Sequence, residues 1–183
     1  MSFLKLAANP VEASAANLPE RKPKVRERRQ AIISINPMRS IVDKMCIRDS
    51  KEVKEVIAKA EQYISNGQSV VVYTSRELVK LDTDDKDKIL QVSVDISNAV
   101  VRVIGDLTVK PSFIVAKGGI TSSDVGTKAL RVKKATVMGQ IKPGIPVWMT
   151  GEESKFPNMP YVIFPGNVGE VTTLREAVEI LMG

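Results

Sequence analysis

The feature that most limits the possible folds of this chain is the alternation of amphipathic helical segments with short apolar runs. From residue 50 to residue 64 the apolar side chains recur every three or four positions, which predicts an amphipathic helix ending near Gly67. The run 69–74 follows directly and is rich in β-branched residues, as strands buried within a parallel sheet are. A helix that leads into a buried strand indicates an α/β fold.

The rest of the chain continues this alternation. A second helical pattern extends over residues 89–107, and a second buried run over residues 113–116 leads through two glycines into a helix from about residue 122 to residue 130. Short apolar runs predict strands over residues 135–138, 146–149 and 161–164, and residues 172–181 predict a closing helix. We therefore expect an α/β fold with a mostly parallel sheet flanked by helices.

The first 50 residues differ in composition from the remainder. They hold ten Lys and Arg against five Asp and Glu, whereas residues 51–183 hold 17 against 16. Residues 21–29 form a charged run without an apolar face, which is typical of solvated chain, and the short apolar run 31–35 is assigned no element. We expect a disordered or non-homologous segment over residues 1–50 and one domain over residues 51–183. Because that domain is nearly neutral, nucleic acid is a disfavoured partner.

The residue inventory excludes several kinds of chemistry. The chain has no histidine and a single cysteine, Cys46, so the usual serine or cysteine triads, zinc clusters and disulfides are excluded, and no metal ligands are assigned. It carries no secretory signal pattern and no apolar run near the roughly 18 residues that a membrane span requires. We expect a cytoplasmic protein without a membrane partner.

A candidate anion site lies where the second buried run ends. Gly118 and Gly119 let a phosphate approach the backbone, and the following helix start presents free N–H groups. Hydroxyl donors are added by Thr121, Ser122 and Ser123. The alternative is structural: Thr121 and Asp124 form a helix capping box, and the glycines make a tight turn. Neither of the two common glycine-rich phosphate loops, of dehydrogenases or of P-loop enzymes, occurs in the chain.

A second glycine segment follows the buried run 161–164 and contains Gly166 and Asn167. If both strands belong to a parallel sheet, both glycine segments lie at the carboxyl ends of strands, where open α/β sheets bind ligands. Trp148 lies between the two segments in sequence. Its indole either stacks on a nucleotide base or belongs to the core, and the second is the commoner role of a lone tryptophan.

Three motifs resemble one known family. The segments FIVAKGGITSSD (113–124), GQIKPGIPVW (139–148) and PYVIFPGNVG (160–169) resemble the C-terminal nucleotide-binding domain of four-carbon acid sugar kinases, and residues 71–78 fit the same family. Three long motifs in one order are more specific than a lone glycine pattern. The resemblance implies an ATP-dependent kinase that phosphorylates a hydroxyl of tetronate-type acids such as threonate or erythronate, with magnesium accompanying the nucleotide.

The same resemblance implies which residues bind ATP. In the first glycine segment, the residues that cradle the phosphates are Gly118, Gly119, Ile120 and Thr121, and their neighbours Ser122 and Asp124 also belong to the site. In the second segment, Gly166 and Asn167 close the site. The family's N-terminal substrate domain and its Gly-Ser-x-Ser loop have no counterpart in residues 1–50, so the catalytic residues stay unassigned. We expect the chain alone to be inactive, and a non-catalytic nucleotide-binding module is the alternative. A homo-oligomer is left open.

Overall fold

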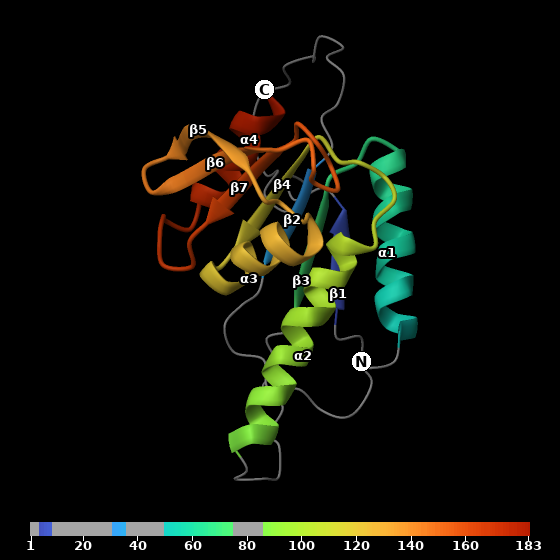
Figure 1. The fold of residues 1–183 in the computed structure, drawn as a ribbon. Coiled ribbons are helices and arrows are strands. Elements are labelled where there is room, and N and C mark those ends of the chain that lie inside the picture. Colours follow the sequence, from blue (N-terminus) through green and yellow to red (C-terminus); the bar gives the residue numbers. More distant parts are fainter. Residues whose placement is uncertain (1–3, 9–30, 36–49, 75–85) are drawn as a thin grey trace.

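The computed structural model describes residues 4–8, 31–35, 50–74 and 86–183. Seven strands form one sheet in the order β1-β3-β2-β4-β7-β6-β5 (Figure 1). They are β1 Leu4–Ala8, β2 Ala31–Ile35, β3 Val70–Thr74, β4 Phe113–Lys117, β5 Ala135–Lys142, β6 Ile145–Thr150 and β7 Pro160–Phe164. The neighbours β3, β2, β4 and β7 are parallel, whereas β1, β6 and β5 pair antiparallel at the two sides. The expected α/β fold, a sheet flanked by helices, is confirmed.

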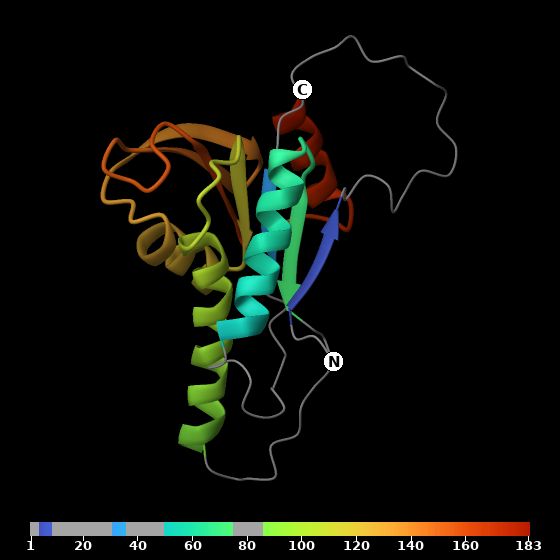
Figure 2. The same cartoon turned by 90° about the vertical axis from the view of Figure 1, so that its right-hand side faces the viewer.

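Helices cover both faces of the sheet. They are α1 Ser50–Ser65, α2 Lys86–Gly105, α3 Gly119–Asp124, which continues as the π-helix η2 Val125–Ala129, and α4 Thr173–Met182. One apolar cluster joins α1, α2 and η2 to one face of the sheet, and a second joins α4 to the other. Figure 2 shows α2 and α4 on opposite sides of the central strands. None of the described helices has the length and apolar composition needed to cross a membrane.

The spacing of the apolar residues along the sequence predicts the helices correctly. In α1 the apolar side chains Val53, Val56, Ala60 and Ile64 are all buried, and the chain leaves the helix through Gly67 at a φ of 78°. This is the left-handed conformation that glycine adopts without strain. The helices expected from residues 50, 89 and 172 and the strands expected over residues 69–74 and 113–116 are likewise observed, with ends shifted by a few residues.

The N-terminal region departs from the expectation. The expected disordered extension over residues 1–50 is wrong for Leu4–Ala8 and Ala31–Ile35, which are strands of the sheet. The second of these, β2, even lies between β3 and β4 near the sheet centre. Its two partners come at least 35 residues later in the sequence, so that no local pattern reveals the pairing. The rest of the expected extension, residues 1–3, 9–30 and 36–49, lies outside the described residues.

Candidate functional site

The two glycine segments meet at one edge of the sheet. β4 and β7 are parallel neighbours, and Lys117 at the end of β4 is paired with Phe164 at the end of β7. The Gly118 N–H donates to the Phe164 carbonyl at 2.8 Å, and a β-carbon on Gly166 would lie 3.9 Å from the Gly118 Cα. The two loops are therefore in contact at the carboxyl ends of neighbouring parallel strands, which is where ligands of open α/β sheets bind.

The first loop turns directly into helix α3. Gly118 has a φ of 112°, and the helix begins at Gly119 without a side-chain cap. Ser122 N–H makes the first helical bond, to the Gly118 carbonyl at 2.8 Å. Within the described part of the chain, the N–H groups of Gly119, Ile120 and Thr121 have no recorded acceptor, as the first N–H groups of a helix generally lack one. They form a set of donors facing away from the helix.

Gly119 differs from its neighbours in having free space around it. A β-carbon at this position would meet no heavy atom within 4 Å. The side chain of Ile120 is 73% exposed, whereas Thr121 is buried. Gly166 and Asn167 of the second loop are both exposed at the same edge of the sheet. The backbone of the first loop is therefore open to a ligand from the side of Gly119.

Ser122 holds the first loop in place. Its Oγ lies 2.7 Å from the carbonyl oxygens of both Ala116 and Gly118, so the hydroxyl ties the helix start to the end of β4. The buried hydroxyl of Tyr161 donates to the Ser122 carbonyl at 2.6 Å, and burial raises the pKa of this phenol. The side-chain contacts of Ser122 are thus with the protein backbone.

The capping box that was the alternative for Thr121 and Asp124 does not form. The helix begins at Gly119 rather than near residue 122, so Thr121 lies inside the first turn. The carboxylate of Asp124 accepts a hydrogen bond from Ser97 at 3.5 Å and pairs with Lys128 at 2.9 Å. Asp124 therefore connects α3 to α2 and to η2, and these contacts lie one and a half turns along the helix from the glycine loop.

Lys117 is a residue that the sequence interpretation left without a role. Its Nζ lies 4.2 Å from the centre of the Phe164 ring and 3.4 Å from the Pro165 carbonyl oxygen, so this cation sits beside the second loop. Burial lowers the pKa of the Lys117 ammonium. It forms no ion pair with the described acidic residues. The signal that could have indicated it is a lysine directly before the glycine pair, at the end of an otherwise apolar strand.

The second loop leads into α4. Glu170 N–H donates to the Thr173 hydroxyl at 2.7 Å, and a β-carbon on Gly169 would lie 2.8 Å from the Thr173 Cβ. Gly169 is therefore required by close packing at the start of α4. Among the described residues, no group of three or more acidic or cysteine side chains could hold a metal ion.

A family model described as the nucleotide-binding C-terminal domain matches residues 24–174. This match confirms the domain that the three motifs predict, and it begins upstream of residue 51, where the sequence interpretation placed the start of the domain. Among curated proteins, none matches the chain.

Solved structures share the fold at low sequence identity. A domain of unknown function (DUF1537) from Bordetella bronchiseptica, a domain-swapped dimer with bound citrate, is 16% identical with a TM-score of 0.52; the match covers 84% of this chain and 41% of that one. A DUF1537 protein of Haemophilus influenzae is 18% identical with a TM-score of 0.51, and the match covers 92% of this chain and 42% of that one. A protein of Salmonella typhimurium LT2 named as a candidate tRNA synthase is 13% identical with a TM-score of 0.58, and the match covers 82% of this chain and 40% of that one. The chain thus spans about two fifths of the length of these structures.

Proposed function

Because this chain belongs to the family of nucleotide-binding C-terminal domains, we propose that its two glycine loops bind the phosphates of ATP for phosphoryl transfer to a four-carbon sugar acid. The observation that carries the proposal is the contact between the loops at the carboxyl ends of β4 and β7, with open space at Gly119. Backbone N–H groups at a helix start, next to glycines, are a recurrent way of binding phosphate.

The proposed roles divide between backbone and side chains. The N–H groups of Gly119, Ile120 and Thr121 donate to phosphate oxygens, while Gly166 and Asn167 close the site from the second loop. Lys117 supplies positive charge beside that loop. Phosphoryl transfer needs positioning and charge stabilisation more than covalent chemistry from the protein, and backbone donors with one cation fit that requirement. Ser122 and Asp124 support the loop and its helix through the contacts given above.

The sugar-acid substrate rests on the resemblance of three sequence motifs to four-carbon acid sugar kinases. Among the described residues, neither an acid-binding site nor a catalytic base is assigned. Magnesium would accompany the nucleotide phosphates, since this ion is commonly held by phosphates with only one or two carboxylates. The described residues form no acidic cluster for it, so no step is assigned to a resident metal.

A second candidate function is a nucleotide-binding module without catalysis of its own. The match to a nucleotide-binding domain, whose description names no catalytic activity, favours it. Both candidates require nucleotide binding at the glycine loops, and they differ only in turnover. An assay of ATP-dependent phosphorylation of threonate and erythronate separates them.

The binding site itself is tested by Gly119→Val. A β-carbon at Gly119 would meet no heavy atom within 4 Å, and the added side chain would occupy the proposed approach of the phosphate. We expect calorimetry with ADP and magnesium to detect no binding to this variant, while its circular dichroism and melting temperature stay close to those of the wild type. Gly105→Ala is the control, because a β-carbon there makes ordinary contacts of 3.6 Å and lies away from both loops. Unchanged ADP affinity in folded Gly119→Val would remove this loop from the site.

A further inference from the structure

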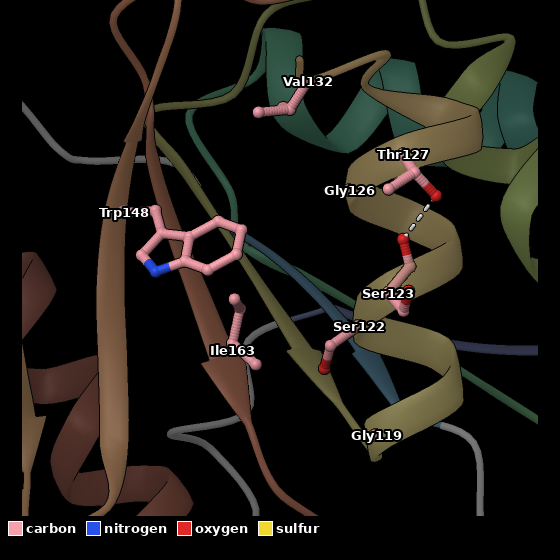
Figure 3. A pocket seen from close by; sticks show the side chains of 8 residues that line it. All are labelled: Gly119, Ser122, Ser123, Gly126, Thr127, Val132, Trp148 and Ile163. Atoms are coloured by element: carbon pink, nitrogen blue, oxygen red, sulfur yellow. Dashed lines mark hydrogen bonds between the residues drawn. The ribbon is translucent and has the colours of Figure 1, made fainter. Parts of the chain in front are cut away.

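A cavity of about 200 Å³ lies between the α3–η2 helix and the strands β6 and β7. Figure 3 shows the indole of Trp148 extending from β6 toward the helix, with Ile163 of β7 beside it. Gly119 marks one end of the cavity and Val132 the other, and the helix side between them is lined by Gly126 and hydroxyl residues. The cavity is therefore a slot with an aromatic wall on one side and small residues on the other.

The slot is continuous with the candidate phosphate site. Gly119 is both the first residue of α3 and part of the lining of the cavity. A ligand whose phosphate lies on the N–H groups at the start of α3 can thus place its remaining part in the slot. We propose that the cavity binds the adenine base of the nucleotide, with the base against the indole of Trp148. This inference rests on the proposed nucleotide binding at the glycine loops.

The size of the cavity fits a base better than a whole nucleotide. Pockets that enclose a complete drug-sized ligand measure about 300–1,000 Å³, so a cavity of about 200 Å³ accommodates one part of such a ligand. Aromatic and aliphatic side chains on the sheet side present the flat, apolar surface on which bases stack. The helix side of the cavity carries glycine, serine and threonine.

Trp148 is suited to this role by its partial burial. The side chain packs against the main apolar cluster but is not among the fully buried residues, and it also lines the cavity. Thr127 directs its hydroxyl to the Ser123 carbonyl at 2.8 Å, and the Ser122 hydroxyl is bonded to backbone as described. The Ser123 hydroxyl makes no bond within the described part of the chain, which leaves it available to the edge of a base.

Fluorescence tests the inference directly, because Trp148 is the only tryptophan of the chain. The full chain is titrated with ADP, with adenosine and with inorganic tripolyphosphate, and binding is followed in parallel by calorimetry. We expect ADP and adenosine to quench or shift the tryptophan emission, whereas tripolyphosphate binds without changing it. Binding of ADP with unchanged emission would overturn the base site while leaving the phosphate site intact. If neither ADP nor tripolyphosphate binds, the proposed function fails and the base site fails with it.

Two substitutions give an independent test by affinity. Ser123→Leu places a larger side chain in the slot without removing a described side-chain hydrogen bond, and Ser65→Leu at the exposed end of α1 is its matched control. Trp148→Leu removes the stacking surface. Stacking of a base on an aromatic side chain corresponds to a loss of about 5- to 150-fold in affinity when it is removed.

We expect a loss of that size for ADP in both cavity variants, with the affinity for tripolyphosphate unchanged and Ser65→Leu equal to the wild type. The Ser123 substitution keeps the test decisive if Trp148→Leu does not fold. Wild-type ADP affinity in folded Ser123→Leu would refute the placement of the base in this cavity.

Discussion

Substitutions of the adjacent residues Ser122 and Ser123 can separate the contribution of the Ser122 hydroxyl to the stability of the glycine loop from any contribution to ligand binding. Ser122 is 2% exposed, and its hydroxyl ties the helix start to the carbonyls of Ala116 and Gly118. Ser123 is exposed and has no described side-chain bond. We expect Ser122→Ala to destabilise the fold and Ser123→Ala to leave its stability nearly unchanged.

The magnitude follows from the contacts of the hydroxyl. It has one proton and therefore donates to one carbonyl at a time. After the substitution the Gly118 carbonyl still accepts a hydrogen bond from the N–H of residue 122, so the hydrogen bond that is lost is the one from the hydroxyl to the Ala116 carbonyl. The Ala116 carbonyl also belongs to the β-ladder, so the cost is that of one lost hydrogen bond, about 0.5–1.5 kcal/mol, and the better helix propensity of alanine offsets about 0.5 kcal/mol. For a domain of this size, a net loss of up to about 1 kcal/mol lowers the melting temperature by up to about 4 °C.

The assay is urea and thermal unfolding followed by circular dichroism, with ADP affinity measured on the folded variants. Ser122→Ala should lose stability as estimated and keep the ADP affinity of the wild type, because its hydroxyl contacts protein backbone. Ser123→Ala should stay within about 0.5 kcal/mol, as exposed substitutions generally do. The reasoning is refuted if the two variants are equally stable, or if Ser122→Ala keeps its stability and loses ADP.

Two further predictions concern the change of stability with pH and the catalytic activity of the chain alone. Glu61 accepts hydrogen bonds from the hydroxyl and the N–H of Thr108, each at 2.6 Å, and these bonds lower the pKa of the Glu61 carboxyl below its usual 4.5. Charged Glu61 therefore contributes its full stabilisation above the usual pKa, and this stabilisation is lost as the pH falls through the lower pKa of the carboxyl in the folded protein. Urea midpoints of wild type and Glu61→Gln should differ most near neutral pH and converge in acid; a constant difference would contradict this. For catalysis, we expect the chain alone to show no appreciable phosphorylation of threonate or erythronate, because the described residues provide no assigned site that orients the acid against the nucleotide. Robust turnover would contradict this.

Part of the fold and of the site follows from local sequence patterns. The buried run 113–116, the glycine pair and the helix after them predict a strand, a turn and a helix, and this is the observed order. That both glycine segments lie at one edge of the sheet was also expected, because the carboxyl ends of parallel strands lie at the same edge. These features were accessible because each depends on neighbours in sequence or on a general rule of sheet geometry.

Other features depend on contacts that no local pattern contains. β2 is a strand because β3 and β4 pair with it, whereas its own sequence is a short apolar run between polar segments. The start of α3 was placed three residues too late, because glycine is a poor helix former and the hydroxyl cluster resembles a cap. The observed start depends instead on the φ of 112° at Gly118 and on the bond from Ser122 to the end of β4.

The glycines of α3, η2 and the loop before them differ in backbone conformation and in the space around them. Gly118 is needed for its backbone, since a φ of 112° is strained for any residue with a side chain. A β-carbon on Gly126 would lie 3.3 Å from the Cε1 of Tyr161, a tight contact that the ring would have to relieve by a small shift. Gly119 has neither feature within the described part of the chain: its φ is not positive, and a β-carbon would meet nothing. What the absent side chain leaves open is the space shared by the helix start and the cavity beside Trp148, which is the space that the proposed nucleotide would occupy.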